Sequence, residues 1–177
     1  MTEIPIAPDI REHAQDLLEF IDASPSPWHA VSTVGNRLEK HGFIKLEEKE
    51  SWSLDPGGRY CVVRDDSSIV VFVVGHSPLT DAGFRIVGAH TDSPGLRVKP
   101  NAAGQLGSMT RVGVEVYGGP ILATFADRDL SLAGRVNLRH GPGGMDTWLL
   151  RFKQPLLRLP NLAIHMNRRV NDDGLKF

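Results

Sequence analysis

Residues 84–95 constrain this chain more than any other segment. In them an apolar run is followed directly by a histidine and, two residues later, by an aspartate. The apolar residues of 84–89 predict a strand buried on both faces, and Ser-Pro-Gly at 93–95 predicts a turn after it. Side chains two residues apart share one face of a strand, so His90 and Asp92 should lie together where it ends. An imidazole backed by a carboxylate is a common pair at zinc sites. The segment is therefore a candidate metal site, although the spacing alone favours a histidine hydrogen-bonded to the backbone, and the aspartate could equally form an Asx turn.

The residues before this segment predict an α/β domain. Apolar residues recur at helical spacing over 10–21, and a second helix should begin after Ser26, with Pro27 at its first position, and end at Gly42. Two β-rich runs, 59–64 and 69–74, are separated by Asp-Asp-Ser-Ser, which is typical of a hairpin turn. Two helices followed by strands of one sheet indicate the α/β class.

The character of the chain changes after Pro100. Residues 101–104 and 107–108 have loop composition, and apolar residues alternate with others over 112–116, as in a strand. We therefore predict two domains: an α/β part at residues 1–100 and a β-rich part at residues 101–177.

Composition excludes several classes of protein. The apolar fraction of 41% is normal for a globular chain, and a net charge of −1 argues against nucleic-acid binding. The longest apolar stretch is too short to span a bilayer, and no signal peptide is readable, so we expect no membrane partner. The single cysteine, Cys61, lies among apolar residues and is expected to be a buried small hydrophobe. A lone cysteine is typical of a reducing compartment, and we expect a cytoplasmic location.

Four blocks of sequence, in order along the chain, resemble the M18 family of zinc aminopeptidases, the aspartyl aminopeptidases. The most specific block is Val-Gly-Ala-His-Thr-Asp-Ser-Pro-Gly-Leu-Arg-Val-Lys-Pro at 87–100. The other three are Ser-Pro-Trp-His-Ala at 26–30, Tyr-Gly-Gly at 117–119 with Asp-Arg-Asp-Leu at 127–130, and Ala-Ile-His-Met-Asn-Arg at 163–168.

The resemblance implies a function and assigns roles to three residues. Family members bind two metal ions and remove the amino-terminal residue, especially an acidic one, from peptide substrates. By this resemblance His90 is a zinc ligand, Asp92 orients its imidazole, and His165 reaches the active site of a neighbouring subunit to contact substrate. The intact protein is then expected to be a homo-oligomer.

Length sets a limit on this expectation. Family members are much longer than this chain, and one histidine with one outer carboxylate is too few for a site that needs three or four ligands. We expect the first half of a zinc-peptidase catalytic domain followed by part of a β-rich dimerisation domain, inactive alone. The alternatives are an interaction or subunit-like module that keeps the dimerisation surface, and a regulatory module without metal.

Two further patterns have alternative interpretations. His165 lies among apolar residues, where a hydrogen-bonded core histidine is a common arrangement. Asp127-Arg128-Asp129 could supply paired carboxylates, although a charged turn with an internal Arg–Asp pair is the favoured interpretation.

Overall fold

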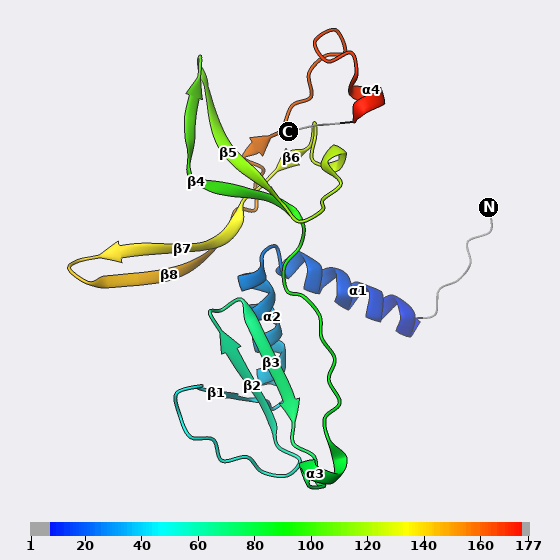
Figure 1. The fold of residues 1–177 in the computed structure, drawn as a ribbon, viewed down its shortest axis with the longest axis vertical. Helices are drawn as coiled ribbons and strands as arrows, with labels where there is room; N and C mark the ends of the chain where they lie inside the picture. Colours follow the sequence, from blue (N-terminus) through cyan, green and yellow to red (C-terminus); the bar gives the residue numbers. More distant parts are fainter. Residues whose placement is uncertain (1–7, 175–177) are drawn as a thin grey trace. The chain divides into compact units, whose positions relative to one another are not determined.

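The computed structural model describes residues 8–174, which form two compact units with interleaved sequences (Figure 1). The first unit takes residues 8–92 and 133–150, and the second takes residues 93–132 and 151–174. The chain thus leaves the first unit immediately after the His-Thr-Asp motif and returns to it for one hairpin. The two predicted domains, residues 1–100 and 101–177, stay a prediction.

Two helices open the first unit, as the sequence predicts. Helix α1 spans Pro8–Ala23 and helix α2 spans Pro27–Lys40. The hydroxyl oxygen of Ser26 accepts a hydrogen bond from the backbone N–H of His29 at 3.4 Å, so Ser26 is the N-cap of α2. Helix α2 ends before Gly42, whose φ of +76° is a backbone conformation that favours glycine.

A three-stranded sheet packs with these helices in the same unit. Strand β1 (Ile44–Leu46) runs parallel to β2 (Arg59–Arg64), which pairs antiparallel with β3 (Ser68–Val73). Asp65 and Asp66 form the turn between β2 and β3 with φ values of 49° and 52°, and this confirms the predicted hairpin. Aspartate tolerates this left-handed region better than most residues do.

The remaining elements of the first unit are a short helix and a hairpin. Helix α3 spans Leu79–Ala82, and strands β7 (Ala133–His140) and β8 (Gly144–Arg151) form a two-stranded ladder. Arg135 on β7 ties this hairpin to the rest of the unit, because its guanidinium lies 3.0 Å from the Asp65 carboxylate and stacks over the Trp28 ring.

The core of the described residues is small and lies between α2 and β2. Its five buried apolar side chains are those of Ala30, Val31, Tyr60, Cys61 and Val62. Cys61 is 5% exposed, which confirms the expected buried thiol, and burial raises its pKa above the ordinary value for cysteine. Such a thiol contributes to packing and is a poor nucleophile.

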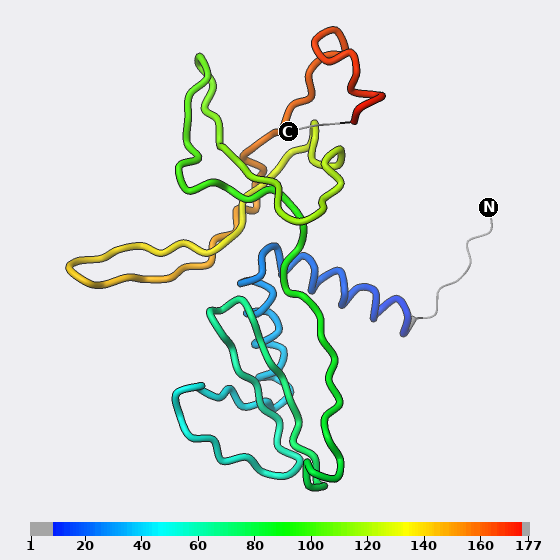
Figure 2. The backbone as a smooth tube through the Cα atoms, viewed as in Figure 1, coloured from blue at the N-terminus to red at the C-terminus, as the bar shows by residue number. Residues whose placement is uncertain are grey.

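The prediction of a buried strand over 84–89 is wrong for this structure. The segment is extended but carries no ladder hydrogen bonds, and its apolar side chains face solvent, with Val87 98% exposed. Figure 2 shows the backbone between α3 and the second unit as a single extended trace. A strand forms only where a neighbouring strand can accept its backbone hydrogen bonds, and residues 8–174 supply no such neighbour here.

The second unit is built mainly of strands. Strand β4 (Gly95–Leu106) pairs antiparallel with β5 (Met109–Tyr117) around a turn at Gly107, which has φ +62°. Residues 101–104, predicted as a loop, lie inside β4, where the register shifts between Val98 and Ala103. Pro100 sits in that irregular stretch, because it has no N–H to donate to a regular ladder.

Short elements complete the second unit. The 3-10 helix η1 spans Leu122–Thr124, strand β6 (Asp129–Leu130) pairs antiparallel with β9 (Leu157–Arg158), and helix α4 spans Val170–Asp173. Across residues 8–174, no helix combines the length and apolar character that a membrane span requires.

Candidate metal and substrate residues

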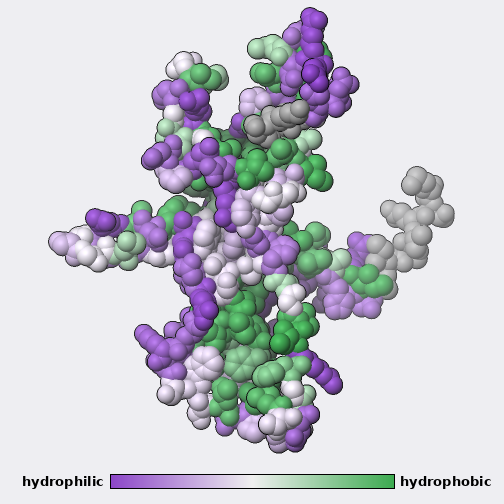
Figure 3. All heavy atoms as spheres, in the orientation of Figure 1, coloured by the Kyte–Doolittle hydropathy of each residue, from purple (hydrophilic) through white to green (hydrophobic). Residues whose placement is uncertain are grey.

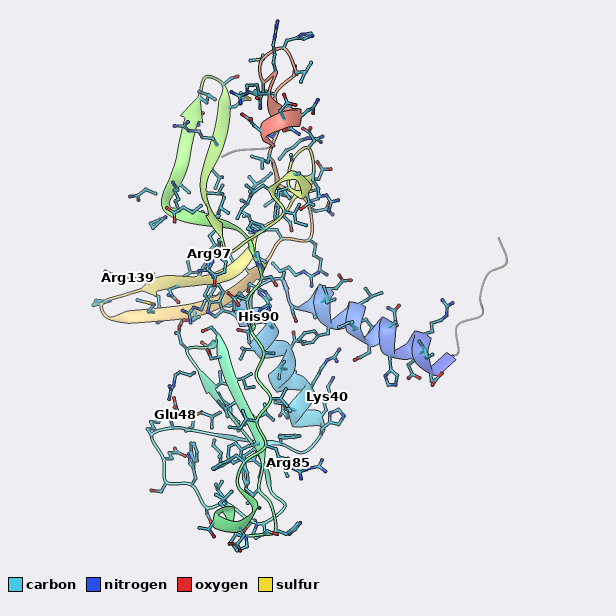
Figure 4. The ribbon with its side chains drawn as sticks, turned by 45° about the vertical axis from the view of Figure 1, so that its right-hand side comes forward. Lys40, Glu48, Arg85, His90, Arg97 and Arg139 are labelled. Atoms are coloured by element: carbon cyan, nitrogen blue, oxygen red, sulfur yellow. The ribbon has the colours of Figure 1, made fainter. Side chains whose placement is uncertain are left out.

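The structure brings His90 and Asp92 together, as their spacing predicts. The imidazole Nδ1 of His90 lies 2.6 Å from the backbone carbonyl oxygen of Asp92 and 3.4 Å from its carboxylate Oδ1. Figure 4 shows His90 on the extended segment that leads into the second unit. The nearer acceptor is therefore the main-chain carbonyl of Asp92, and the carboxylate is the second neighbour of the same nitrogen.

This geometry determines which imidazole nitrogen can bind a metal. A carbonyl oxygen only accepts hydrogen bonds, so Nδ1 must carry the proton that it donates to Asp92. In a neutral histidine the other nitrogen, Nε2, then has the lone pair that a metal needs. The His90 side chain is 77% exposed, so solvent reaches it.

A threonine between these two residues anchors the motif to the sheet. The hydroxyl of Thr91 donates to the backbone carbonyl of Ser67 at 2.8 Å, in the turn just before β3 begins. Because Thr91 is flanked by His90 and Asp92, this bond holds both of them beside the β2–β3 hairpin. Nothing in the local sequence reveals this contact, since it joins residues 24 positions apart.

The described residues do not complete a zinc site. In the part of the chain from 8 to 174, no group of three or more histidine, cysteine, aspartate or glutamate side chains is placed to hold a metal ion. Zinc sites use three or four protein ligands, whereas this motif offers one imidazole and the residue that orients it. The two cavities found between α2 and the sheet are lined by neither His90 nor Asp92.

His165 lies in the second unit, on a turn. The backbone N–H of Met166 donates to the carbonyl of Ala163 at 2.8 Å, which closes a turn that contains the histidine. His165 is exposed, so the alternative of a hydrogen-bonded core histidine does not describe this structure. An exposed position is what contact with a substrate would need.

The Asp-Arg-Asp motif is a turn, but its partners come from distant sequence. Asp127 adopts a φ of +53°, and Asp129 forms an ion pair with Arg158 at 3.3 Å rather than with Arg128 inside the motif. The two oxygens of the Asp127 carboxylate accept hydrogen bonds from Asn161. The predicted turn is confirmed and its predicted internal pair is wrong, because Arg158 on β9 lies directly across the ladder from Asp129.

The chain matches one family model over most of its length. Residues 20–176 match the model of Peptidase_M18, described as aminopeptidase I zinc metalloprotease. This match covers well over half of the chain, which therefore belongs to the M18 family of zinc aminopeptidases. The predicted family is confirmed.

Individual relatives agree with the family model. The chain is 52% identical over 158 residues to the probable M18 family aminopeptidase 2 of Pseudomonas fluorescens, covering 89% of this chain and 36% of that protein. It is 51% identical over 160 residues to the same-named protein of Ectopseudomonas mendocina, of which it covers 37%. The chain thus spans little more than a third of the length of the curated relatives it matches.

Solved structures share the fold. The structure aligns with a cryo-EM structure of an Ape4 and Nbr1 complex at a TM-score of 0.87 and 41% identity, over 94% of this chain and 32% of that chain. It aligns with the mApe1 dodecamer of S. cerevisiae at a TM-score of 0.80 and 28% identity, over 89% of this chain and 37% of that chain. The predicted class, an α/β part followed by strands as in the first portion of an M18 aminopeptidase, is confirmed.

Proposed function

We propose that this chain supplies part of the active site of a metalloaminopeptidase that removes amino-terminal residues, preferably acidic ones, from peptides. The observation that carries the proposal is the His90 geometry, found in a chain that belongs to a family of zinc aminopeptidases. Nδ1 is occupied by Asp92, which leaves Nε2 with the lone pair required of a zinc ligand. Bound zinc supplies Lewis-acid chemistry and activates water in such enzymes.

In this proposal His90 is one zinc ligand and Asp92 orients it. The described residues supply fewer donors than zinc requires, so we infer that the other ligands come from outside this chain. The relatives support this inference, since each is nearly three times as long as the part that matches.

His165 is proposed to contact the substrate within a homo-oligomer. Its exposure on a turn supports this role, and the dodecameric relative supports an assembly in which subunits meet. The same proposal includes a cytoplasmic location, which a single cysteine that is buried and forms no disulfide favours. Nucleic acid is not proposed as a partner, given the net charge of −1.

A second candidate function is an interaction module that associates with other chains. The observation that favours it is the large number of exposed apolar side chains, for example Phe84, Ile86 and Val87, with exposed fractions of 76%, 87% and 98%. Figure 3 shows hydrophobic residues open to solvent over β3 and the extended segment of the first unit. Apolar surface of this kind marks a site where other protein packs.

The deciding experiment uses the full-length protein expressed from the complete reading frame that contains these 177 residues. It measures hydrolysis of glutamyl, aspartyl, leucyl and lysyl p-nitroanilides, together with bound zinc by mass spectrometry. We expect zinc-dependent hydrolysis that is faster for the two acidic substrates. Zinc-dependent hydrolysis with no acidic preference would reject the proposed specificity, and no hydrolysis of any substrate would favour the interaction module.

A further inference from the structure

Asp127 joins two parts of the second unit that lie far apart in sequence. Its carboxylate accepts the backbone N–H of Asn161 at 3.1 Å through Oδ1 and the side-chain Nδ2 of Asn161 at 3.2 Å through Oδ2. The backbone N–H of Asp127 also donates to the carbonyl of Leu159 at 2.8 Å. Three hydrogen bonds therefore connect one residue to the segment 159–161.

The backbone of Asp127 is itself held in place. Its carbonyl accepts a hydrogen bond from Nη2 of Arg158 at 3.0 Å, and its φ of +53° lies in the left-handed region, two residues before β6 begins. Aspartate and asparagine adopt this left-handed conformation more readily than other residues with side chains. The residue type at 127 thus suits both the backbone conformation and the two hydrogen bonds.

These bonds end four residues before His165. Between them the chain enters the turn closed by Met166 and Ala163, where Asn167 also donates to the Ala163 carbonyl at 3.2 Å. Residues 161–166 are all exposed, so no buried side chain fixes this stretch. Its position therefore depends on hydrogen bonds, and the contacts from Asp127 are placed at its base.

We propose that Asp127 is a positioning residue, which anchors Asn161 and thereby fixes the turn that presents His165 to the substrate. This inference rests on the substrate role proposed above for His165. Asp127 does not touch the substrate itself. A carboxylate suits the role because each of its two oxygens accepts one of the two donors of Asn161.

The first test exchanges the amide of Asn161 and the carboxylate of Asp127, at Asn161 alone and then at both residues, in the full-length protein. Asn161→Asp places two carboxylates against each other, so amide hydrogen exchange over 161–167 should become about tenfold faster. The double change Asp127→Asn with Asn161→Asp restores one donor and one acceptor, and exchange should return close to the parent rate. Asp129→Asn is the matched control, because it removes the ion pair with Arg158 and leaves Asn161 bonded to Asp127.

The second test asks whether the pair acts through His165. Asn161→Asp should raise KM for glutamyl p-nitroanilide about tenfold with little change in kcat, as expected for lost ground-state and transition-state binding alike. In a His165→Ala background the same change should have no further effect, because residues that act as one unit are not additive. The double swap should restore KM.

The two tests distinguish a failure of the positioning role of Asp127 from a failure of the substrate role of His165. Equal effects of Asn161→Asp with and without His165 would overturn the positioning role, as would unchanged exchange over 161–167. If His165→Ala leaves KM unchanged while Asn161→Asp still accelerates exchange, the substrate role of His165 is rejected and the anchoring of the turn stands without that function.

Discussion

At the scale of single residues, His90 is held by two oxygens of one neighbour. The main-chain carbonyl of Asp92 lies 2.6 Å from Nδ1 and its carboxylate lies 3.4 Å away. The carbonyl belongs to the backbone of Asp92, so substitution of the Asp92 side chain should leave its contact with His90 in place. The two residues should therefore respond to mutation in different ways.

Replacing His90 by Ala should remove a metal ligand. In the full-length protein we expect loss of nearly all peptidase activity and a lower zinc content, because a zinc site uses only three or four protein ligands. Activity and bound zinc are measured on the same preparation. Near-normal turnover with a full metal complement would show that His90 is not a ligand.

Replacing Asp92 by Asn should have a milder effect. Loss of an outer carboxylate reduces metal affinity by roughly 10- to 100-fold, and we expect the lower end because the carbonyl still accepts from Nδ1. Zinc competition with a chelator measures this affinity. An unchanged zinc affinity and rate would reject the orienting role of the carboxylate.

The Cys61 thiol should react slowly with a thiol reagent. Burial raises its pKa, so at pH 8 a smaller fraction is thiolate than in a free cysteine, and only the thiolate attacks. We expect the native protein to react with Ellman's reagent about tenfold or more slowly than the same protein unfolded in guanidinium. Equal rates before and after unfolding would contradict the buried position of Cys61.

At the scale of elements, the segment 84–89 shows that apolar composition alone does not make a strand. The apolar residues are extended as predicted, yet they have no ladder partner among residues 8–174. The segment is tied to the first unit at its end, by the hydrogen bond from Thr91 to Ser67. This bond holds the motif that follows.

Replacing Thr91 by Val should loosen this element. The substitution keeps the shape and the β-branch but removes a hydrogen bond that contributes about 1 kcal/mol. Tryptic cleavage after Arg85, which lies in the same segment (Figure 4), should become about fivefold faster. Thr91→Ser keeps the hydroxyl and should cleave at the parent rate. Equal cleavage of both variants would show that the hydroxyl does not anchor the segment.

At the scale of the whole molecule, the described residues bury few side chains and expose many large apolar ones. Among the residues whose burial the structure describes, only five apolar side chains are buried, all on α2 and β2. Extended apolar surface and unpaired backbone favour association with other protein. The 177-residue chain by itself should therefore associate with other protein molecules.

The 177-residue chain purified alone should neither hydrolyse acidic aminoacyl substrates nor retain zinc after dialysis. One imidazole leaves at least two ligand positions without protein donors, and the exposed apolar surface should drive association. Activity, bound zinc and particle size are measured together. A stable monomer with stoichiometric zinc and peptidase activity would show that the chain is a complete enzyme.

Most of what could be predicted from sequence depends on contacts within a few residues. The Ser26 cap, the turn at Asp65 and Asp66 and the proximity of His90 to Asp92 follow from local backbone geometry, which neighbouring residues set. The family follows from the order of its motifs. These features needed no knowledge of the distant parts of the chain.

Only the tertiary structure decided the contacts that join distant segments. The absence of a ladder partner for 84–89 within residues 8–174, the anchoring of Thr91 on Ser67 and the two bonds from Asp127 to Asn161 depend on which segments meet in space. Every residue except proline carries the same backbone donor and acceptor, so sequence gives little signal of which distant group will satisfy them. That choice is made by the packing of the whole chain.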